Sequence, residues 1–114
     1  MAELTLYGLK TCDTCKKAIK ALEAAGRSVA YIDVRTDGVP ADILAGWLAQ
    51  HGDAVINTRS TTWRGLSETD RARAESNPAG LLAEYPTLIK RPVIVTTDGV
   101  TVGWTKAVQA GFGL

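Results

Sequence analysis

The chain has 114 residues, a hydrophobic fraction of 46%, a charged fraction of 22% and a net charge of +1 at pH 7. This balance is typical of one soluble globular domain and excludes disordered, collagen-like and coiled-coil chains. The near-neutral charge argues against a dedicated nucleic-acid binder, and no apolar run approaches the ~18–20 residues of a membrane span.

The N-terminal third predicts a β-α-β unit. Residues 4–7 are a strand candidate that ends at Gly8, and residues 28–33 are a second. Between them, apolar residues recur at helical spacing over 12–25, and Gly26 supplies the stop. Because a helix separates the two strands, we expect them to pair in parallel.

The middle of the chain predicts a helical insertion at about residues 38–86. Residues 41–50 carry apolar side chains on one helical face, and Ser67 and the Asn77-Pro78 pair each open a further short helix. The Thr- and Ser-rich run 56–64 has no clean period, so we interpret most of it as loop.

The C-terminal part predicts a hairpin followed by a helix. Residues 93–96 and 100–102 are short β-type runs joined by Asp98-Gly99, which is a strong hairpin signal. Residues 105–112 complete the chain as a helix. The order β-α-β, helices, β-β-α predicts a single α/β domain over residues 1–114, with a mixed sheet and a helical insert.

Two cysteines, Cys12 and Cys15, form a C-x-x-C motif at the predicted start of the first helix. A structural zinc site takes four Cys or His ligands, and the chain offers only these two and the distant His51, so we expect no metal. A C-x-x-C motif beside a β-α-β pattern is typical of redox proteins. The alternative is that both are reduced and buried, acting as small hydrophobic residues.

The position of the two cysteines gives them different expected roles. At the first turn of a helix, unpaired backbone N–H groups and the helix dipole favour a Cys12 thiolate, and Lys10 adds positive potential. Cys15 lies one turn on, in the apolar stripe, at a Cα separation of roughly 5–6 Å that a disulfide can span. We therefore predict Cys12 as the nucleophile and Cys15 as the more buried, resolving thiol.

Three arginines form a second set of candidates. Arg59 and Arg64 lie in the Thr- and Ser-rich run, and Arg91 precedes Pro92 and a predicted strand. A guanidinium group suits bidentate capture of oxyanions and carboxylates, although a single arginine is more often a solvated charge. Because the strand after Pro92 must pair beside the first strand, we predict that Arg59 and Arg91 converge on Cys12.

Together these motifs resemble the ArsC/Spx family, specifically its YffB-like branch. The resemblance covers nearly the whole chain and rests on residues 7–18, 57–59, 62–64 and 89–92. It implies a thioredoxin-like fold with an inserted helical segment. By matched position, Cys12 resembles the reductase nucleophile, Arg59 and Arg91 resemble arginines that hold the oxyanion, and Pro92 resembles the cis proline of thioredoxin-like folds.

Two positions depart from the family's arsenate reductases. Gly8 stands where those enzymes carry a histidine, and Trp104 lies where they carry a third arginine. Both departures weigh against arsenate, whereas the YffB-like branch implies glutathione-dependent thiol reduction. The catalytic candidates are Cys12, Cys15, Arg59 and Arg91, and the expected substrate contacts are Lys10, Thr11, Arg64, Pro92 and Trp104.

The leading hypothesis is an ArsC-like thiol oxidoreductase that acts on a small anionic or disulfide substrate. Glutathione or a glutaredoxin would return the electrons, and no bound cofactor is expected. The alternative is an Spx-like regulator that binds RNA polymerase, with the cysteine pair as a redox switch. No secretory signal pattern is evident, so we expect a cytoplasmic monomer with neither membrane nor nucleic acid as a partner.

Overall fold

A computed structural model describes residues 4–114 and divides the chain into two compact regions. The first, called the thiol region here, combines residues 1–34 with residues 91–114. The second, called the helical region, is residues 35–90. No helix among the described residues is long and apolar enough to cross a membrane.

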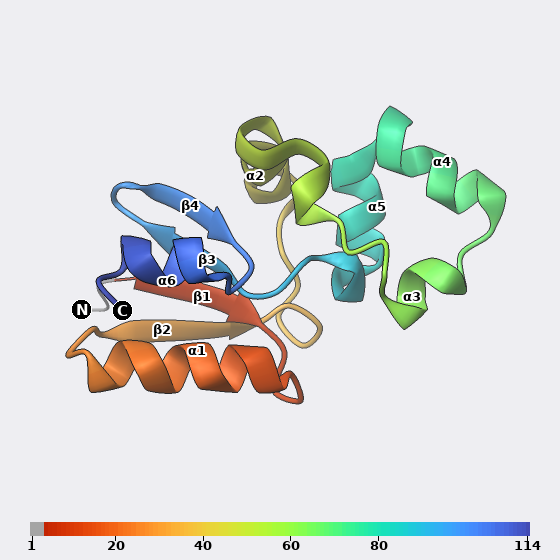
Figure 1. Ribbon diagram of the computed structural model, residues 1–114. Helices are drawn as coiled ribbons and strands as arrows, with labels where there is room; N and C mark the ends of the chain where they lie inside the picture. Colours follow the sequence, from red (N-terminus) through yellow and green to blue (C-terminus); the bar gives the residue numbers. More distant parts are fainter. Residues whose placement is uncertain (1–3) are drawn as a thin grey trace. The chain divides into compact units, whose positions relative to one another are not determined.

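The thiol region is a four-stranded sheet with two helices (Figure 1). Its elements are β1 (Leu4–Gly8), α1 (Asp13–Ala24), β2 (Val29–Asp33), β3 (Val93–Thr96), β4 (Gly99–Val102) and α6 (Lys106–Gly111). The strand order is β2-β1-β3-β4, with β1 parallel to β2 and antiparallel to β3, and β3 antiparallel to β4. A β-α-β unit followed by β-β-α in this order is the thioredoxin-like fold, which confirms the predicted α/β class and mixed sheet.

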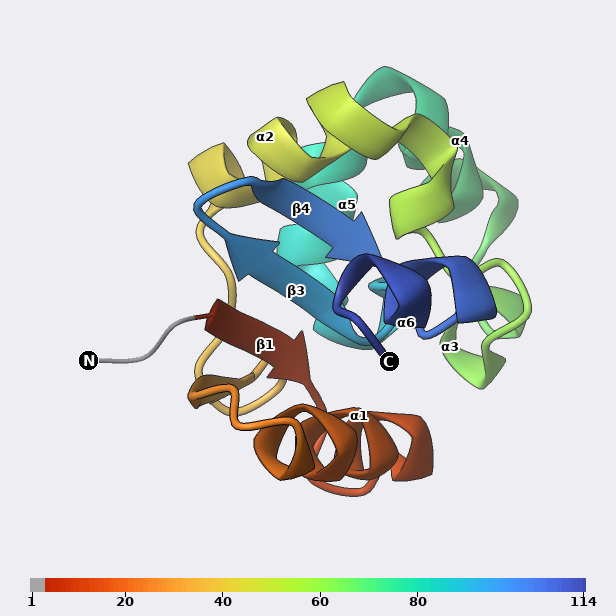
Figure 2. The same ribbon diagram turned by 60° about the vertical axis from the view of Figure 1, so that its left-hand side comes forward.

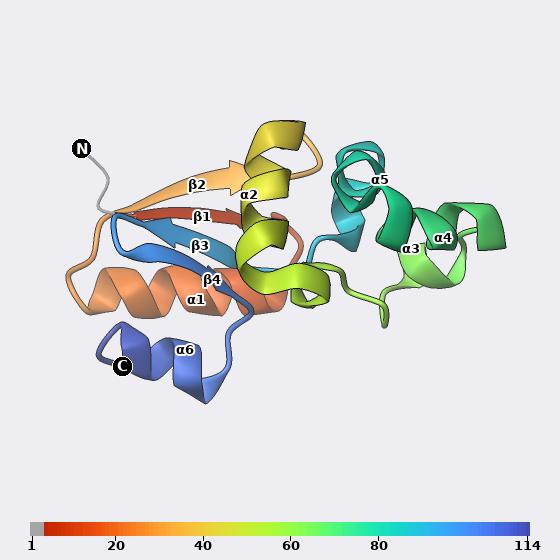
Figure 3. The ribbon, with the colours of Figure 1, turned by 90° about the horizontal axis from the view of Figure 1, so that it is seen from above.

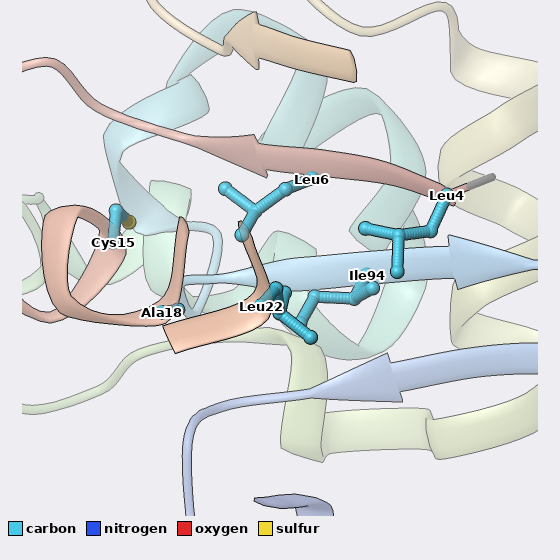
Figure 4. Packing of buried hydrophobic residues seen from close by; sticks show 6 residues of the cluster. All are labelled: Leu4, Leu6, Cys15, Ala18, Leu22 and Ile94. Carbon is cyan, nitrogen blue, oxygen red and sulfur yellow. The ribbon is translucent and has the colours of Figure 1, made fainter. Parts of the chain in front are cut away.

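The core of the thiol region lies between the sheet and α1. Alternate β1 residues point to one face, and there the strands supply Leu4, Leu6 and Ile94, whereas α1 supplies Cys15, Ala18 and Leu22 (Figure 4). The helix residues recur at helical spacing, so they line one face of α1. Helix α6 covers the same face of the sheet as α1 (Figure 3).

Both ends of α1 follow from its sequence. Cys12 is the N-cap, with an extended backbone at φ −84° and ψ 113°. At the other end Gly26 adopts φ +83°, and the Arg27 N–H donates to the Leu22 carbonyl at 2.9 Å. This is the Schellman arrangement, which glycine favours because it enters the left-handed region without a Cβ clash.

The helical region is built from short helices (Figure 2). Its elements are α2 (Ala41–His51), η1 (Gly52–Val55), α3 (Thr61–Arg64), α4 (Glu68–Ser76), α5 (Pro78–Glu84) and η2 (Pro86–Leu88). Helices α2 and α5 pack against each other, and their buried residues are Leu44, Trp47, Leu81 and Leu82. A β-bridge between Ile56 and Ile89 joins the two ends of the segment that holds α3, α4 and α5.

Most predicted elements lie within a residue or two of the observed ones, but the run 56–64 was interpreted too simply. Its last four residues form α3, because the Ser60 hydroxyl accepts from the Trp63 N–H at 3.1 Å and caps the first turn. The Thr62 hydroxyl also hydrogen-bonds the Thr87 hydroxyl at 2.7 Å. A helix this short leaves no period for sequence analysis to detect.

Candidate functional site

Cys12 lies at the junction between β1 and α1 and is half-buried. Its N–H donates to the Leu9 carbonyl at 3.0 Å, and its carbonyl accepts from the Lys16 N–H at 3.1 Å. Its side chain makes no capping hydrogen bond, unlike most polar N-cap residues. The thiol is therefore uncommitted at a helix N-terminus, where backbone N–H groups and the helix dipole stabilise negative charge.

Cys15 is the buried thiol of the pair, as predicted, with 1% of its surface exposed. Burial raises the pKa of the Cys15 thiol to about 12, and a hydrogen bond and charge repulsion from the Cys12 side chain act in the same direction. The Leu9 N–H, which hydrogen-bonds the sulfur, and the positive charge of Arg91 lower the pKa by less. At neutral pH Cys15 is thus a neutral thiol beside Cys12.

Asp33 is a functional candidate that sequence reasoning missed. It ends β2 beside Gly8, is 7% exposed, and its carboxylate accepts from the Lys10 N–H at 3.1 Å. The next residue, Val34, donates its N–H to the Gly8 carbonyl at 2.9 Å. These two bonds fix the loop that precedes Cys12. The available signal was a carboxylate at the end of a partly buried strand, since buried carboxylates need partners.

Arg91 and Pro92 connect to β3 in the thiol region. Arg91 is half-buried, and its charge acts on the Cys15 thiol. The Arg91-Pro92 peptide bond is cis, Pro92 is fully buried, and its carbonyl accepts from the Gly103 N–H at 2.8 Å. Because β3 pairs with β1, Arg91 is brought to the cysteine end of the sheet, as the sequence predicted.

Trp104 packs against the same core cluster as Cys12. Its ring stacks on Phe112 with centroids 6.5 Å apart, and its carbonyl accepts from the Gln109 side chain. These contacts give Trp104 a packing role. Lys10 and Thr11 are exposed in the loop before Cys12, so they are accessible for the substrate contacts predicted for them.

Arg59 and Arg64 belong to the helical region, and both are exposed. The Arg59 N–H donates to the Asn57 side-chain oxygen at 3.1 Å, which closes a tight turn. Arg64 ends α3, and its carbonyl accepts from the Arg71 guanidinium at 3.0 Å. The convergence of Arg59 on Cys12 stays a prediction, as does a substrate contact by Arg64.

A cavity of about 390 Å³ lies elsewhere in the thiol region, and none of the predicted site residues lines it. It is lined by residues of β3, β4, the turn between them and α6, together with Arg27. Within residues 4–114 no cluster of three or more His, Cys, Asp or Glu side chains is arranged to hold a metal ion.

Comparison with known proteins identifies the family. The model of the ArsC family matches residues 7–112. The chain belongs to the ArsC family. The predicted resemblance is confirmed, and it covers the cysteine motif, the Arg91-Pro92 junction and the helical region alike.

Relatives within and around the ArsC family cover nearly the whole chain. An uncharacterized protein of Haemophilus influenzae is 41% identical over 112 residues, covering 96% of this chain and 98% of its own. A solved YffB protein shares 34% identity at a TM-score of 0.87, covering 95% and 96% of the two chains. An arsenate reductase-related protein from Brucella melitensis shares 33% at a TM-score of 0.74, covering 100% and 97%. The global transcriptional regulator Spx of Streptococcus pneumoniae is 26% identical over 106 residues, covering 90% of this chain and 80% of Spx.

Proposed function

We propose that this ArsC-family protein is a thiol oxidoreductase in which Cys12 is the nucleophile and Cys15 resolves the intermediate. The observation that carries the proposal is the pairing of two different thiols. Cys12 is half-buried at a helix N-terminus with its side chain uncommitted, and Cys15 is buried beside it. A thiolate is the attacking species in disulfide exchange, and Cys12 is the thiol whose surroundings favour it.

The reaction balances in two steps. The Cys12 thiolate attacks one sulfur of a disulfide substrate, forms a mixed disulfide, and the other sulfur leaves as a thiolate that takes up a proton. Cys15 then loses its proton and attacks the Cys12 sulfur, which forms the Cys12–Cys15 bond and releases the second substrate thiol. Two electrons have passed from the protein to the substrate.

The neighbourhood of Cys15 favours this order of events. Two of the influences that raise its pKa come from the Cys12 side chain. Both disappear when Cys12 is tied up in a mixed disulfide, whereas the Leu9 N–H and the Arg91 charge still stabilise a Cys15 thiolate. The resolving thiol therefore ionises more readily after the first step than before it.

Glutathione or a glutaredoxin is the proposed electron donor, and the cytoplasm, where thiols are kept reduced, is the proposed compartment. Arg59 and Arg91 are the proposed partners of an anionic group on the substrate, because guanidinium groups bind carboxylates and oxyanions in a bidentate manner. We propose weak or absent arsenate reduction, because Gly8 and Trp104 replace side chains of the family's arsenate reductases.

The test is a coupled assay with a small disulfide substrate, glutathione, glutathione reductase and NADPH, run beside an arsenate assay. We expect turnover of the disulfide by the wild type and a loss of at least about 100-fold in Cys12→Ser, because serine is a far weaker nucleophile at neutral pH. The matched control is Thr14→Ala, an exposed change in the first turn of α1, which keeps its activity. Equal activity in Cys12→Ser and the wild type would overturn the proposal.

A second candidate function is a redox-switched regulator, and the observation that favours it is the similarity to Spx. In that case the Cys12–Cys15 disulfide would change a surface that binds RNA polymerase, without turnover. Pull-down of RNA polymerase with the reduced protein, the oxidised protein and Cys15→Ser separates the two. Redox-dependent binding by a protein without reductase activity would favour the regulator.

A further inference from the structure

Gly8, the last residue of β1, lies directly against α1. A Cβ on residue 8 would stand 2.5 Å from the Cys15 Sγ and 3.1 Å from the Cys15 Cβ. Both separations are shorter than the 3.5–4.0 Å at which nonbonded carbon atoms attract. Gly8 is not among the glycines with positive φ, so its backbone conformation does not require glycine. What requires glycine here is the space occupied by the Cys15 side chain.

The backbone on the Gly8 side is held from two directions. Gly8 pairs with Asp33 in the parallel ladder, and its carbonyl accepts the Val34 N–H at 2.9 Å. Two residues later, the Lys10 N–H donates to the Asp33 carboxylate at 3.1 Å. A side chain on residue 8 could therefore gain room by moving the strand only at the cost of these bonds.

The helix on the other side is held equally well. Ala18 and Leu22 follow Cys15 on the buried face of α1, and both are fully buried in the core. Rotation about the Cys15 Cα–Cβ bond is the smallest movement left. That rotation would carry the sulfur out of its hydrogen bond with the Leu9 N–H and away from the Cys12 side chain.

We propose that Gly8 is a positioning residue for the resolving thiol: lacking a side chain, it seats the Cys15 sulfur beside Cys12 and so sets how readily the Cys12–Cys15 disulfide forms. The inference rests on the proposed function, in which Cys15 resolves. The step it controls removes two electrons and two protons from the two thiols and forms one S–S bond. In the test, oxidised dithiothreitol takes up those electrons and protons and becomes the dithiol.

The experiment measures the Cys12–Cys15 equilibrium directly, without a substrate. Wild type, Gly8→Ala and Gly46→Ala are equilibrated with graded ratios of reduced to oxidised dithiothreitol, alkylated and analysed by mass spectrometry. Gly46 is the matched control, because it is an exposed glycine in α2 and a Cβ there meets no atom within 4 Å. We expect at least a tenfold weaker disulfide in Gly8→Ala, which is a reduction potential about 30 mV less negative. Gly46→Ala should match the wild type.

A second comparison covers the case in which Gly8→Ala folds poorly. Cys15→Ala and the double variant Gly8→Ala/Cys15→Ala are unfolded in urea beside wild type and Gly8→Ala. Because the double variant lacks the sulfur, the alanine at residue 8 should cost less stability there than in the presence of Cys15. An equal cost in both backgrounds, or a Gly8→Ala disulfide as stable as that of the wild type, would overturn the inference.

These outcomes are distinct from those of the activity assay. A wild-type protein that forms a Gly8-dependent disulfide but turns over no disulfide substrate would lose the proposed function and keep this inference. Full turnover by Cys15→Ser would keep the oxidoreductase function and overturn the role of Gly8, because no resolving thiol would then be needed.

Discussion

The helices of the two regions begin in different ways. In the helical region, three of the four α-helices start at a residue whose side chain accepts a backbone N–H, namely Ser60, Ser67 and Asn77. In the thiol region Thr105 does the same for α6, but α1 starts at Cys12, whose side chain makes no such bond. A polar cap contributes about 1 kcal/mol to helix stability. The helix that carries the reactive thiol forgoes that contribution, which leaves the sulfur and the first-turn N–H groups available to a substrate.

The regions also differ in how their cores are assembled. The core of the thiol region is a sheet face covered by α1, with β3 arriving from the far end of the sequence. The helical region has no strand of its own beyond the Ile56–Ile89 bridge, and its buried residues come from contiguous helices. Both nevertheless contain fully buried leucines, Leu22 in one and Leu82 in the other.

The largest expected effect tests whether the helical region has a true core. Leu22→Ala and Leu82→Ala should each lower the free energy of unfolding by about 2–5 kcal/mol, because both leave a cavity in a closely packed interior. Urea unfolding followed by circular dichroism measures both. Leu114→Ala, at a residue that is 45% exposed, should change stability by less than about 0.5 kcal/mol. A Leu82→Ala cost as small as that of Leu114→Ala would show that the helical region lacks a core.

The next effect distinguishes the regions by pH. The folded state holds the pKa of Cys15 at about 12, above the ordinary 9.0, so it binds this proton more tightly than the unfolded chain does. The stabilisation is complete below pH 9 and is lost as the pH rises toward 12. Under reducing conditions, stability should therefore fall less steeply between pH 9 and 11 in Cys15→Ala than in the wild type. Identical slopes would contradict the buried-thiol description.

Tyr85 gives the helical region a counterpart. The charges of Asp70 and Glu84 raise the pKa of Tyr85, so its contribution to stability is also lost at alkaline pH. Tyr85→Phe should flatten the decline above pH 10, and NMR of the ¹³Cβ of Cys15 should still show no titration step below about pH 10. A Cys15 step that moved with Tyr85→Phe would show that the two titrations cannot be assigned to separate regions.

Removing a cap from the helical region should cost less than removing core volume. Ser67→Ala and Asn77→Ala should each lower the free energy of unfolding by about 0.5–2 kcal/mol, because the N–H groups of Asp70 and Gly80 lose their acceptors. The control is Ser76→Ala, whose exposed hydroxyl makes only a long 3.4 Å bond to the Ala72 carbonyl. Caps that cost no more than this control would remove the contrast with α1.

The smallest expected effect has the opposite sign. Cys12→Ser places a good capping side chain at an N-cap with suitable extended geometry, so we expect a gain of a few tenths to about 1 kcal/mol in stability. The measurement is urea unfolding in the presence of a reductant, beside Thr14→Ala. A loss of stability in Cys12→Ser would mean that the Cys12 sulfur contributes more packing than its half-buried position indicates.

Local signals were sufficient to predict most elements. The spacing of Cys15, Ala18 and Leu22 predicted α1 and the burial of the second thiol, and Asn77-Pro78 marked the start of α5. The Asp98-Gly99 turn predicted the hairpin, and the pairing of β3 with β1 followed from topology. Each of these depends on neighbouring residues or on a general rule of connection.

The rest depends on contacts between distant segments. The Asp33 carboxylate meets the Lys10 N–H only because β1 and β2 end side by side, and Gly8 meets Cys15 only because α1 packs closely on β1. Neither contact leaves a periodic trace in the sequence. The Gly8 difference was visible in the sequence as a departure from the family's arsenate reductases, but its steric reason required the fold.

The central place of β1 has a consequence for synthesis of the chain. The two strands that flank it come from opposite sides of the helical region, β2 soon after it and β3 only near the end. While the polypeptide emerges from the ribosome, β1, α1 and β2 are available long before β3 can close the open edge. Until then Ile94 is missing from the cover of Cys15, so both thiols of the nascent chain are exposed to oxidants and to other cysteines. Sequestration of the pair is therefore one of the last events of folding, and a reducing environment is needed most before the protein is finished.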